Sequence, residues 1–356
     1  SEKINLEKCI QSTFVSSVGS FVTEFGEKLA SYTNSPSVVP CINGTAALHT
    51  ALLLAGVEPG DLVITQALTF VATANAIKYC GADPIFVDVD VETMGMSPSA
   101  LKCWLESQAY IDDDGFCRTK VKHQKIKACV PMHTFGHAVR INELIEICEN
   151  WRLCLVEDAA EALGSKYDGN HLGTFGMFGT LSFNGNKIIT TGHGGAILSS
   201  STLGKKVLHL TTTAKVSHPY EYIHDQVGYN YRMANVNAAI GCAQLEFIDK
   251  FVKVKRDLAS KYDDFFANTD YCLVKEPENC VSNYWLNAVV CPSKKEREVL
   301  LKSTNAVGVM TRPLWNLMSD LDPFSHCLKG DLKNSQWLFD HVVCLPSGVN
   351  SEALAG

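Results

Sequence analysis

The sequence predicts an α/β fold, with a large domain built on a mostly parallel sheet and a smaller α/β domain after it. The first observation is a strand, a helix and a strand in succession at residues 62–65, 71–79 and 85–89, an order typical of βαβ units. The second is the apolar run 153–156, which is typical of a strand buried on both faces. The third is size, because 356 residues with 46% apolar side chains can form one large core and a smaller one.

Local patterns predict the remaining elements. Residues 43–56 begin with the cap residue Asn43, continue with alanine and leucine and stop at a glycine, which predicts a helix. Residues 106–127 are polar and charged, which predicts an excursion on the surface. Further strands are expected at residues 126–130 and 284–290, and a further helix is expected to include residues 296–303.

A long amphipathic stretch sets the expected boundary between the domains. Apolar and charged residues alternate with helical spacing over residues 236–266, which predicts one long helix that bridges two domains. Residues 1–245 are therefore expected to form the large domain with its N-terminal segment. Residues 246–356 are expected to form the linking helix and the small domain.

The charge of the chain restricts the classes of partner. A net charge of −7 without a basic block argues against nucleic acid or an anionic membrane as a partner. No stretch has the unbroken apolar length of a membrane span, and residues 1–6 lack the hydrophobic core of a signal peptide. We therefore expect a soluble, cytoplasmic chain.

Cysteine and histidine positions do not predict a metal site. The 14 cysteines are scattered and many lie in apolar runs, which favours reduced, buried thiols over a disulfide framework. His133 and His137 lie four residues apart, as in a zinc-binding helix, but Gly136 between them argues against such a helix.

One lysine, Lys187, lies among small and polar residues, with two isoleucines after it and a glycine cluster at 192–195. A lysine that is partly desolvated in such a setting offers an amine that can attack a carbonyl. A phosphate loop of the Walker type is excluded, because Asn186 and Ile188 stand where glycine and Ser or Thr are needed. A solvated turn with an idle lysine is the alternative that this stretch alone leaves open.

Two further features favour chemistry at this lysine. Asp158 follows the buried strand at its carboxyl end, where ligands bind in open α/β sheets and where a carboxylate can pair with a protonated ring nitrogen. The alternative for Asp158 is a helix N-cap, with Glu161 completing a capping box. The helix that begins near residue 43 offers free N–H groups and the hydroxyl of Thr45 to a phosphate, although most helix starts bind nothing.

The chain carries five motifs in the order that one enzyme family has them, at residues 43–48, 68–75, 156–161, 182–187 and 228–235. On these motifs the chain resembles the DegT-type, fold-type I pyridoxal-phosphate aminotransferases that act on nucleotide-linked keto sugars. Weaker similarity extends the resemblance from about residue 12 to residue 346. The resemblance implies a fold-type I transferase, with a mixed, mostly parallel sheet in its large domain.

The resemblance also implies the cofactor and the residues that hold it. The cofactor is expected to be pyridoxal 5'-phosphate, held covalently by Lys187, which is also the expected catalytic base. Asp158 would keep the ring nitrogen protonated, and Phe70 would stack on the ring, although Phe70 alone is more typical of a core residue. The other expected cofactor contacts, most of them at the phosphate, are Gly44, Thr45, Ala46, Glu161, Ser182 and Asn230.

Within the family the chain is most similar to enzymes that aminate the 4-keto carbon of UDP-linked 2-acetamido-2,6-dideoxy-hexoses. The resemblance implies L-glutamate as amino donor. It also implies a homodimer with shared active sites, in which Asn230 reaches the phosphate bound by the partner. A structural role for His133 is an equal alternative to substrate contact. The expected substrate-binding residues are Ser17, His133, Asn186, Tyr231 and Arg232.

Two positions distinguish this chain within the family. His193 stands in the glycine cluster where another glycine is expected, and it would be strained if that position required a positive φ. Lys187 is present where some relatives carry histidine and dehydrate sugars, which favours transamination. Amination at C3, dehydration, a non-catalytic relative that binds a sugar nucleotide and an unrelated binding protein on the same kind of sheet are the alternatives. The hexose, the nucleotide and the stereochemistry of the new amine do not follow from the sequence.

Overall fold

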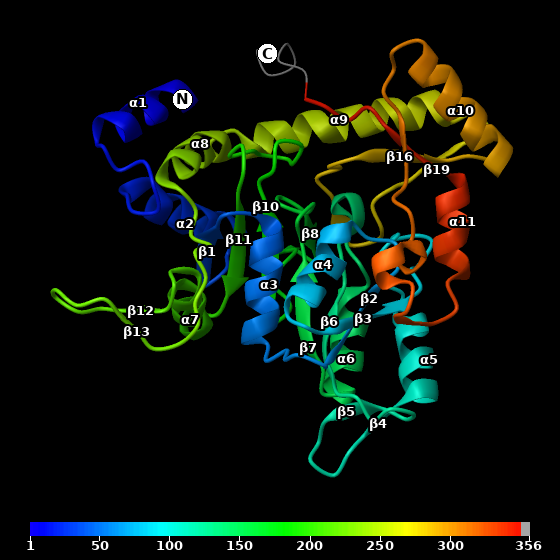
Figure 1. The fold of residues 1–356 in the computed structure, drawn as a ribbon. Helices are drawn as coiled ribbons and strands as arrows, with labels where there is room; N and C mark the ends of the chain where they lie inside the picture. The colour runs from blue at the N-terminus through cyan, green and yellow to red at the C-terminus, as the bar shows by residue number, and fades with distance from the viewer. Residues whose placement is uncertain (350–356) are drawn as a thin grey trace.

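The computed structural model describes residues 1–349 and is organised around an eight-stranded sheet (Figure 1). The strand order is β1-β11-β10-β7-β6-β2-β3-β18. β11 is antiparallel to both of its neighbours, and every other neighbouring pair in this sheet is parallel. The predicted fold class, with its mixed and mostly parallel sheet, is therefore confirmed. The strands are β1 (Ser37–Cys41), β2 (Leu62–Gln66), β3 (Asp83–Val87), β6 (Ile126–Val130), β7 (Cys154–Asp158), β10 (Phe178–Ser182), β11 (Gly195–Ser199) and β18 (Leu328–Lys329).

Helices cover both faces of this sheet, so its central strands are mostly apolar and carry their polar residues chiefly toward their carboxyl ends. Val63 and Val156 pack in one core cluster with residues of α3 and α4. Their neighbours Ile64 and Leu155 pack in another, with residues of α5 and α6. Successive side chains of a strand point to opposite faces, so these two clusters lie on opposite sides of the sheet. The helices are α1 (Glu2–Gln11), α2 (Ser20–Thr33), α3 (Gly44–Leu54), α4 (Val71–Tyr79), α5 (Pro98–Gln108), α6 (Ile141–Asn150), α7 (Ser201–Thr211), α8 (Asn235–Leu245), α9 (Ile248–Phe266), α10 (Lys294–Ala306) and α11 (Lys333–His341).

The C-terminal part of the chain forms a separate antiparallel sheet of four strands, in the order β14-β16-β19-β17. The same part of the chain also contributes β18 to the edge of the large sheet, where it pairs with β3. The division of the chain at residue 245 stays a prediction. The four strands are β14 (Cys272–Leu273), β16 (Asn287–Val290), β17 (Arg312–Pro313) and β19 (Val342–Leu345).

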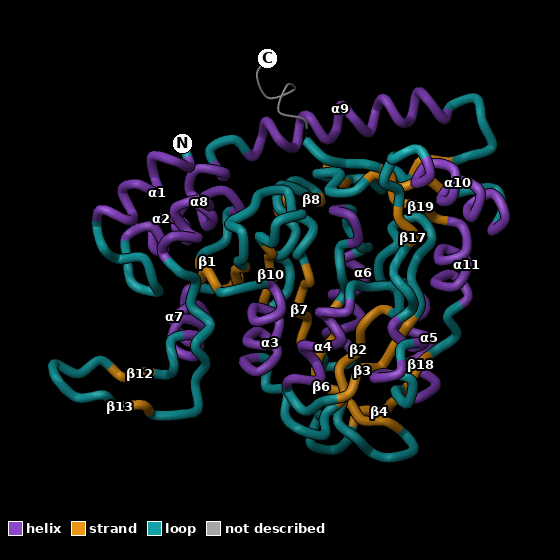
Figure 2. Tube along the Cα trace, turned by 45° about the horizontal axis from the view of Figure 1, so that its top comes forward, coloured by secondary structure: helices purple, strands orange, loops and turns teal. Residues whose placement is uncertain are grey.

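The expectation of one helix over residues 236–266 is wrong, because this stretch forms two helices, α8 and α9. Phe247, with φ −113° and ψ 5°, lies between them. α8 is mostly buried and packs on α1 and α2, whereas α9 has only three buried residues and runs across the molecule to the C-terminal sheet (Figure 2). The two helices pack on different surfaces, which accounts for the break.

Shorter strands form hairpins and small sheets around the large one. The surface excursion expected near residues 106–127 contains the β4–β5 hairpin. The β12–β13 hairpin protrudes from the body of the molecule (Figures 1 and 2). None of the described helices combines the length and the apolar character that crossing a bilayer requires. These short elements are β4 (Ala109–Ile111), β5 (Cys117–Thr119), β8 (Lys166–Tyr167), β9 (Asn170–His171), β12 (Lys215–Val216), β13 (Ile223–His224), β15 (Cys280–Val281) and the 3-10 turns Thr134–Gly136, Met318–Asp320 and Asp322–Phe324.

Candidate active site

A cavity of about 310 Å³ opens at the carboxyl edge of the large sheet. Its wall includes Asp158 at the end of β7, Ser182 at the end of β10 and Gly44 at the start of α3. Since the parallel strands β7 and β10 end at the same edge, residues distant in sequence meet there. The predicted site residues that line this cavity are Gly44, Thr45, Phe70, Asp158, Glu161, Ser182, Asn186 and Lys187.

Lys187 lies in the turn that follows β10, and its side chain is only 11% exposed. Its Nζ lies 3.5 Å from Oε1 of Glu161 and 4.0 Å from the ring centroid of Trp285. A carboxylate on one side and an aromatic face on the other attract and orient the amine. The lysine is therefore held at the cavity wall, and the alternative of a solvated turn with an idle lysine does not fit this structure.

Asp158 is 3% exposed, although it carries a carboxylate. Its Oδ2 accepts a hydrogen bond of 2.7 Å from the Thr73 hydroxyl, and its Oδ1 accepts one of 3.2 Å from the N–H of Ala160. Burial raises the pKa of Asp158, while these two hydrogen bonds and the charge of Lys187 act in the opposite direction. A buried carboxyl of this kind gains most from a positively charged partner in the cavity.

Glu161 is also buried, and its Oε2 accepts a hydrogen bond of 2.8 Å from the N–H of Phe135. Burial raises the pKa of Glu161 to about 7, against the opposing effects of Lys187 and of the Phe135 N–H. Phe135 itself has a φ of 59°, in the left-handed region. The carboxyl thus holds a strained backbone turn and faces the lysine at the same time.

The start of α3 forms the opposite end of the cavity. A Cβ on Gly44 would lie 3.0 Å from the Cβ of Ser182, so glycine lets the helix start approach Ser182 closely. Asn43 caps the helix, and its Oδ1 accepts a hydrogen bond of 2.7 Å from the N–H of Ala46. Ala46 does not line the cavity, and its N–H donates to Asn43, so the expectation that it binds the cofactor phosphate stays a prediction.

Two tryptophans from the C-terminal part of the chain close the cavity, and sequence reasoning assigned no role to either of them. Trp315 lies edge-on to Phe70, with ring centroids 6.3 Å apart. The Nε1 of Trp285 donates a hydrogen bond of 2.6 Å to the carbonyl of Asn186. The sequence also assigned no role at the cavity to Thr73, Asn43 or His193. The only available signal for Thr73 was its place in the motif at residues 68–75.

Comparison with known proteins agrees with this geometry. The model of the DegT/DnrJ/EryC1/StrS aminotransferase family matches residues 1–353. The chain belongs to this family. A GDP-perosamine synthase of Escherichia coli O157:H7 is 39% identical over 315 residues, which are 88% of this chain and 81% of that protein. A GDP-perosamine synthase of Caulobacter vibrioides is 32% identical and covers 98% of this chain and 89% of its own. The solved structure of the aminotransferase TlmJ from Streptoalloteichus hindustanus is 25% identical, with a TM-score of 0.88 over 99% of this chain and 93% of that one.

The protein is a sugar aminotransferase that depends on pyridoxal phosphate, and the cavity fits that cofactor. The buried carboxyl of Asp158 suits a protonated ring nitrogen, since the two charges compensate each other. Gly44 lies close to Ser182 at the start of α3, where the first backbone N–H groups of the helix can bind a phosphate. Lys187 lies in the wall between these two ends, within reach of a carbonyl.

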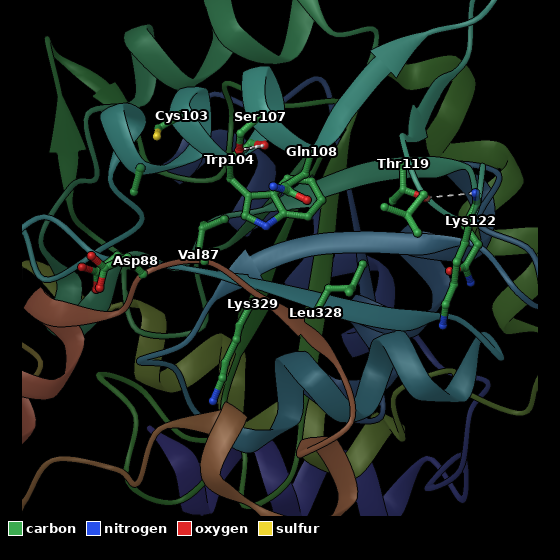
Figure 3. Close-up of a pocket in the computed structure, with 15 residues that line it drawn as sticks. Val87, Asp88, Cys103, Trp104, Ser107, Gln108, Thr119, Lys122, Leu328 and Lys329 are labelled. Carbon is green, nitrogen blue, oxygen red and sulfur yellow. Dashed lines mark hydrogen bonds between the residues drawn. The ribbon is translucent and has the colours of Figure 1, made fainter.

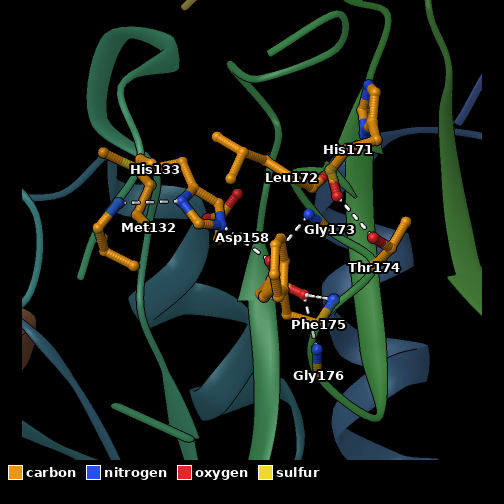
Figure 4. A network of polar contacts seen from close by, with 12 residues as sticks. Met132, His133, Asp158, His171, Leu172, Gly173, Thr174, Phe175 and Gly176 are labelled. Carbon is orange, nitrogen blue, oxygen red and sulfur yellow. Dashed lines mark hydrogen bonds and ion pairs between the residues drawn. The ribbon is translucent and has the colours of Figure 1, made fainter. Parts of the chain in front are cut away.

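His133 does not face the cavity of this aminotransferase, so the expectation that it binds substrate is wrong. Its Nε2 lies 3.0 Å from Oε2 of Glu157, and its Nδ1 accepts a hydrogen bond of 3.3 Å from the N–H of Val139 (Figure 4). Glu157 also accepts hydrogen bonds from the N–H groups of Gly173, Phe175 and Gly176. Both side chains are fully buried, so the alternative of a structural histidine holds.

Four other predicted residues of the aminotransferase lie outside the cavity of their own chain. Asn230 is exposed. The hydroxyl of Tyr231 lies 3.3 Å from Nδ1 of His49, on α3. The backbone of Arg232 pairs with Cys41 at the end of β1, and Ser17 lies in the loop between α1 and α2. Within one chain these residues do not contact the cofactor site.

A larger cavity, of about 530 Å³, lies beside the outermost strands β3 and β18, between α5, β18 and the β4–β5 hairpin (Figure 3). Trp104 and Lys329 are among its lining residues. Asp88 lines it too, but both of its oxygens accept hydrogen bonds from Asn334 and Ser335. Among the described residues, neither lysine of this wall forms an ion pair with a lining carboxylate, whereas Lys187 and Glu161 do so in the smaller cavity, which is the one that matches transamination.

Proposed function

We propose that this aminotransferase transfers the amino group of L-glutamate to the 4-keto carbon of a UDP-linked 2-acetamido-2,6-dideoxy-hexulose. The observation that supports aminotransfer best is the position of Lys187, whose Nζ lies 3.5 Å from Glu161 in the cavity that also contains Asp158. The motifs of the sequence support the 4-keto sugar and the UDP group by resemblance.

When bound, pyridoxal phosphate supplies an electron sink that lets the α-carbon of an amino acid lose its proton. Asp158 holds the ring nitrogen in its protonated form, because the buried carboxylate requires a positive partner. The N–H groups of Gly44 and Thr45 and the hydroxyl of Ser182 bind the phosphate. Phe70 packs on the ring plane and helps to exclude water.

Lys187 has two roles in this proposal. Its amine would hold the cofactor covalently until the amino donor replaces it. The free amine would then act as the base that removes the α-proton of the donor and returns it to the C4′ atom of the cofactor. Glu161 and Trp285 keep the released amine at the wall of the cavity, at the distances seen here. The keto sugar accepts the amino group in the reverse sequence, which predicts ping-pong kinetics.

A GDP-linked keto sugar is the second candidate substrate. It is favoured by the two relatives at 39% and 32% identity, whose names specify a GDP-linked sugar. The catalytic roles of Lys187 and Asp158 are the same for both substrates. The two candidates therefore differ only in the contacts that the nucleotide makes.

The test is an assay of the purified enzyme with L-glutamate and four acceptors, namely UDP- and GDP-linked sugars with the keto group at C4 or at C3. We expect the highest kcat/KM with the UDP-linked 4-keto sugar. Preference for the GDP-linked 4-keto sugar would replace the first candidate by the second. Preference for a 3-keto sugar contradicts both. The Lys187→Ala variant is the control and should lose activity by about a thousandfold or more with every acceptor.

We further propose a homodimer in which each active site is completed by residues of both chains. Asn230, whose backbone pairs with Thr212, and the following residues lie outside the cavity of their own chain. They come shortly after the protruding β12–β13 hairpin in the sequence (Figure 1). This hairpin region exposes Tyr220, Tyr222 and Val227, each at more than 80%. The Nε of Arg232 is buried without a hydrogen-bond partner among residues 1–349. An apolar protrusion of this kind suits a two-fold interface in which each subunit lends the same segment to the other.

Mixed dimers test this sharing. An inactive Asn230→Ala variant and Lys187→Ala are unfolded together and refolded, so that about half of the dimers contain one chain of each kind. If Asn230 acts on the partner's site, a mixed dimer has one doubly damaged site and one intact site. About a quarter of the wild-type activity should then return. A mixture that stays inactive contradicts the shared site.

A further inference from the structure

We propose that His193 is a phosphate-binding residue of the cofactor site, through the N–H of its Nδ1. This inference rests on the proposed cofactor site at the start of α3. His193 lines the same cavity as Gly44, Thr45 and Ser182, the residues assigned to the phosphate. No motif of the sequence assigns a role to this histidine.

The backbone leaves room for a side chain at position 193 and at no other position of the glycine cluster. Gly192 has a φ of 78°, which disfavours any other residue. A Cβ on Gly194 would collide with the hydroxyl of Thr191, and one on Gly195 would lie 2.5 Å from the carbonyl carbon of Asn43. His193 itself is not in the left-handed region, so the strain that was expected if its φ were positive is absent.

The contacts of Asn43 fix which nitrogen of His193 carries the proton. The Oδ1 of Asn43 accepts the Ala46 N–H, so its Nδ2 is the end of the amide that faces the histidine. Nδ2 can only donate, and it lies 3.2 Å from the Nε2 of His193, which must therefore accept. The proton of a neutral ring is then on Nδ1. Within residues 1–349, Nδ1 of His193 has no hydrogen-bond partner.

The charge of the cavity indicates what this N–H donor binds. Asp158 and Glu161 contribute carboxyl groups to the wall. Lys187 and His193 are the only described lining residues that can be positively charged. Lys187 is committed to the covalent bond with the cofactor. The ring of His193, whose Nε2 accepts from Asn43, is neutral, so it adds the N–H of Nδ1 to the donors at the helix start. A phosphate dianion at that end of the cavity is the ligand that this arrangement suits.

The test compares two ligands of the cofactor-free protein, pyridoxal 5'-phosphate and pyridoxal, which differ only in the phosphate. Both dissociation constants are measured by titration, and their ratio isolates the contribution of the phosphate from that of the bond to Lys187. In His193→Ala we expect this ratio to fall about tenfold, as for the loss of one charge-assisted hydrogen bond. His193→Gln, which keeps an N–H donor, should recover part of the loss. His326→Ala, which removes an exposed histidine at the sheet edge, is the matched control and should leave the ratio unchanged.

Three outcomes overturn the inference. The first is an unchanged ratio in His193→Ala, including the case in which only the affinity for the nucleotide sugar falls. The second is an equal loss of affinity for both ligands, which would mean that His193 acts by holding Asn43. The third is destabilisation of the cofactor-free His193→Ala variant, seen as a lower unfolding temperature, that is large enough to explain the whole fall in the ratio. Failure of the wild-type protein to bind either ligand would instead contradict the proposed cofactor site.

Discussion

Glu157 and Asp158 are consecutive residues at the end of β7, and they lie in opposite kinds of environment. Both are buried carboxyl groups, but their side chains point to opposite faces of the sheet. Glu157 accepts three backbone N–H groups and contacts His133, so every site on its carboxylate is used within the fold. Asp158 has two hydrogen bonds and faces a cavity, and burial raises its pKa.

The number of hydrogen bonds that the fold donates to each carboxyl group separates a structural one from a reactive one in this molecule. A carboxylate that the fold satisfies completely has no capacity left for a ligand, and it stabilises the loop that donates to it. A carboxylate that is buried but incompletely satisfied stabilises whatever cation the cavity receives. Substitution of Glu157 should therefore lower mainly the stability of the protein, and substitution of Asp158 should lower mainly kcat.

Asp158→Asn should lower kcat by on the order of a thousandfold, because an amide does not hold the ring nitrogen protonated. The folded protein should persist, since the Asn oxygen can accept the Ala160 N–H while its NH₂ donates to the Thr73 hydroxyl, which can reverse its role. The measurement is kcat at saturating cofactor, with occupancy followed by absorbance. A fully occupied variant that keeps near wild-type kcat would show that Asp158 does not have this role.

Glu161→Gln should change the pH dependence of stability in the cofactor-free protein. The folded-state pKa of Glu161 is about 7, above its ordinary value of 4.5, so between these values the unfolded chain loses a proton that the folded chain keeps. The free energy of unfolding contributed by this group is therefore fully present below pH 4.5 and is lost as the pH rises through 7. The loss amounts to about 3 kcal/mol, which the variant should not show.

This effect of Glu161 is measured by urea unfolding of both proteins at several pH values. The exposed Glu278→Gln is the control, and its difference from the wild type should be flat over the same pH range. A flat difference for Glu161→Gln would show that this carboxyl titrates at its ordinary pH despite its burial.

Glu157→Gln should destabilise the protein by about 2 kcal/mol, because an NH₂ group would face at least one of the backbone N–H donors of residues 173–176. The kcat per folded and loaded molecule should change little, since the side chain does not reach the cavity. Urea unfolding and kcat are measured on the same preparation. A large fall in kcat without loss of stability would reverse the contrast between the two faces.

Thr73→Val should have the smallest effect, a fall in kcat of about tenfold, because it removes one hydrogen bond to the Asp158 carboxylate and keeps the shape of the side chain. Thr50→Val is the matched control. That buried hydroxyl donates to the Ala46 carbonyl within α3 and does not contact the cavity. If both variants lose the same activity, the effect belongs to packing and Asp158 does not depend on Thr73.

The sequence predicted the part of the site that lies at strand ends. Asp158 ends a strand whose apolar pattern is plain, so its place at the edge of the sheet follows from local order. Lys187 was predicted from its small and polar neighbours and its motif, and the strand before it, β10, was not predicted. Trp285 and Trp315 could not be placed in this way, because the C-terminal part of the chain brings them to the cavity through packing over long sequence distances. His133 was assigned to the wrong face because the direction of one side chain in a turn does not follow from its motif. The N–H of Ala46 donates to Asn43, a local contact that its motif alone does not indicate.

The pairing of β18 with β3 has a consequence for the synthesis of the chain. β3 is an apolar strand, with Ile85, Phe86 and Val87 buried, and its outer edge pairs with residues 328–330. During translation that edge lacks this partner until residue 329 has left the ribosome. An open apolar strand edge can pair with other nascent chains, and closing it over so long a loop is slow. We therefore expect the yield of folded enzyme to depend on the rate of translation and on chaperones that cover this edge until residue 329 arrives.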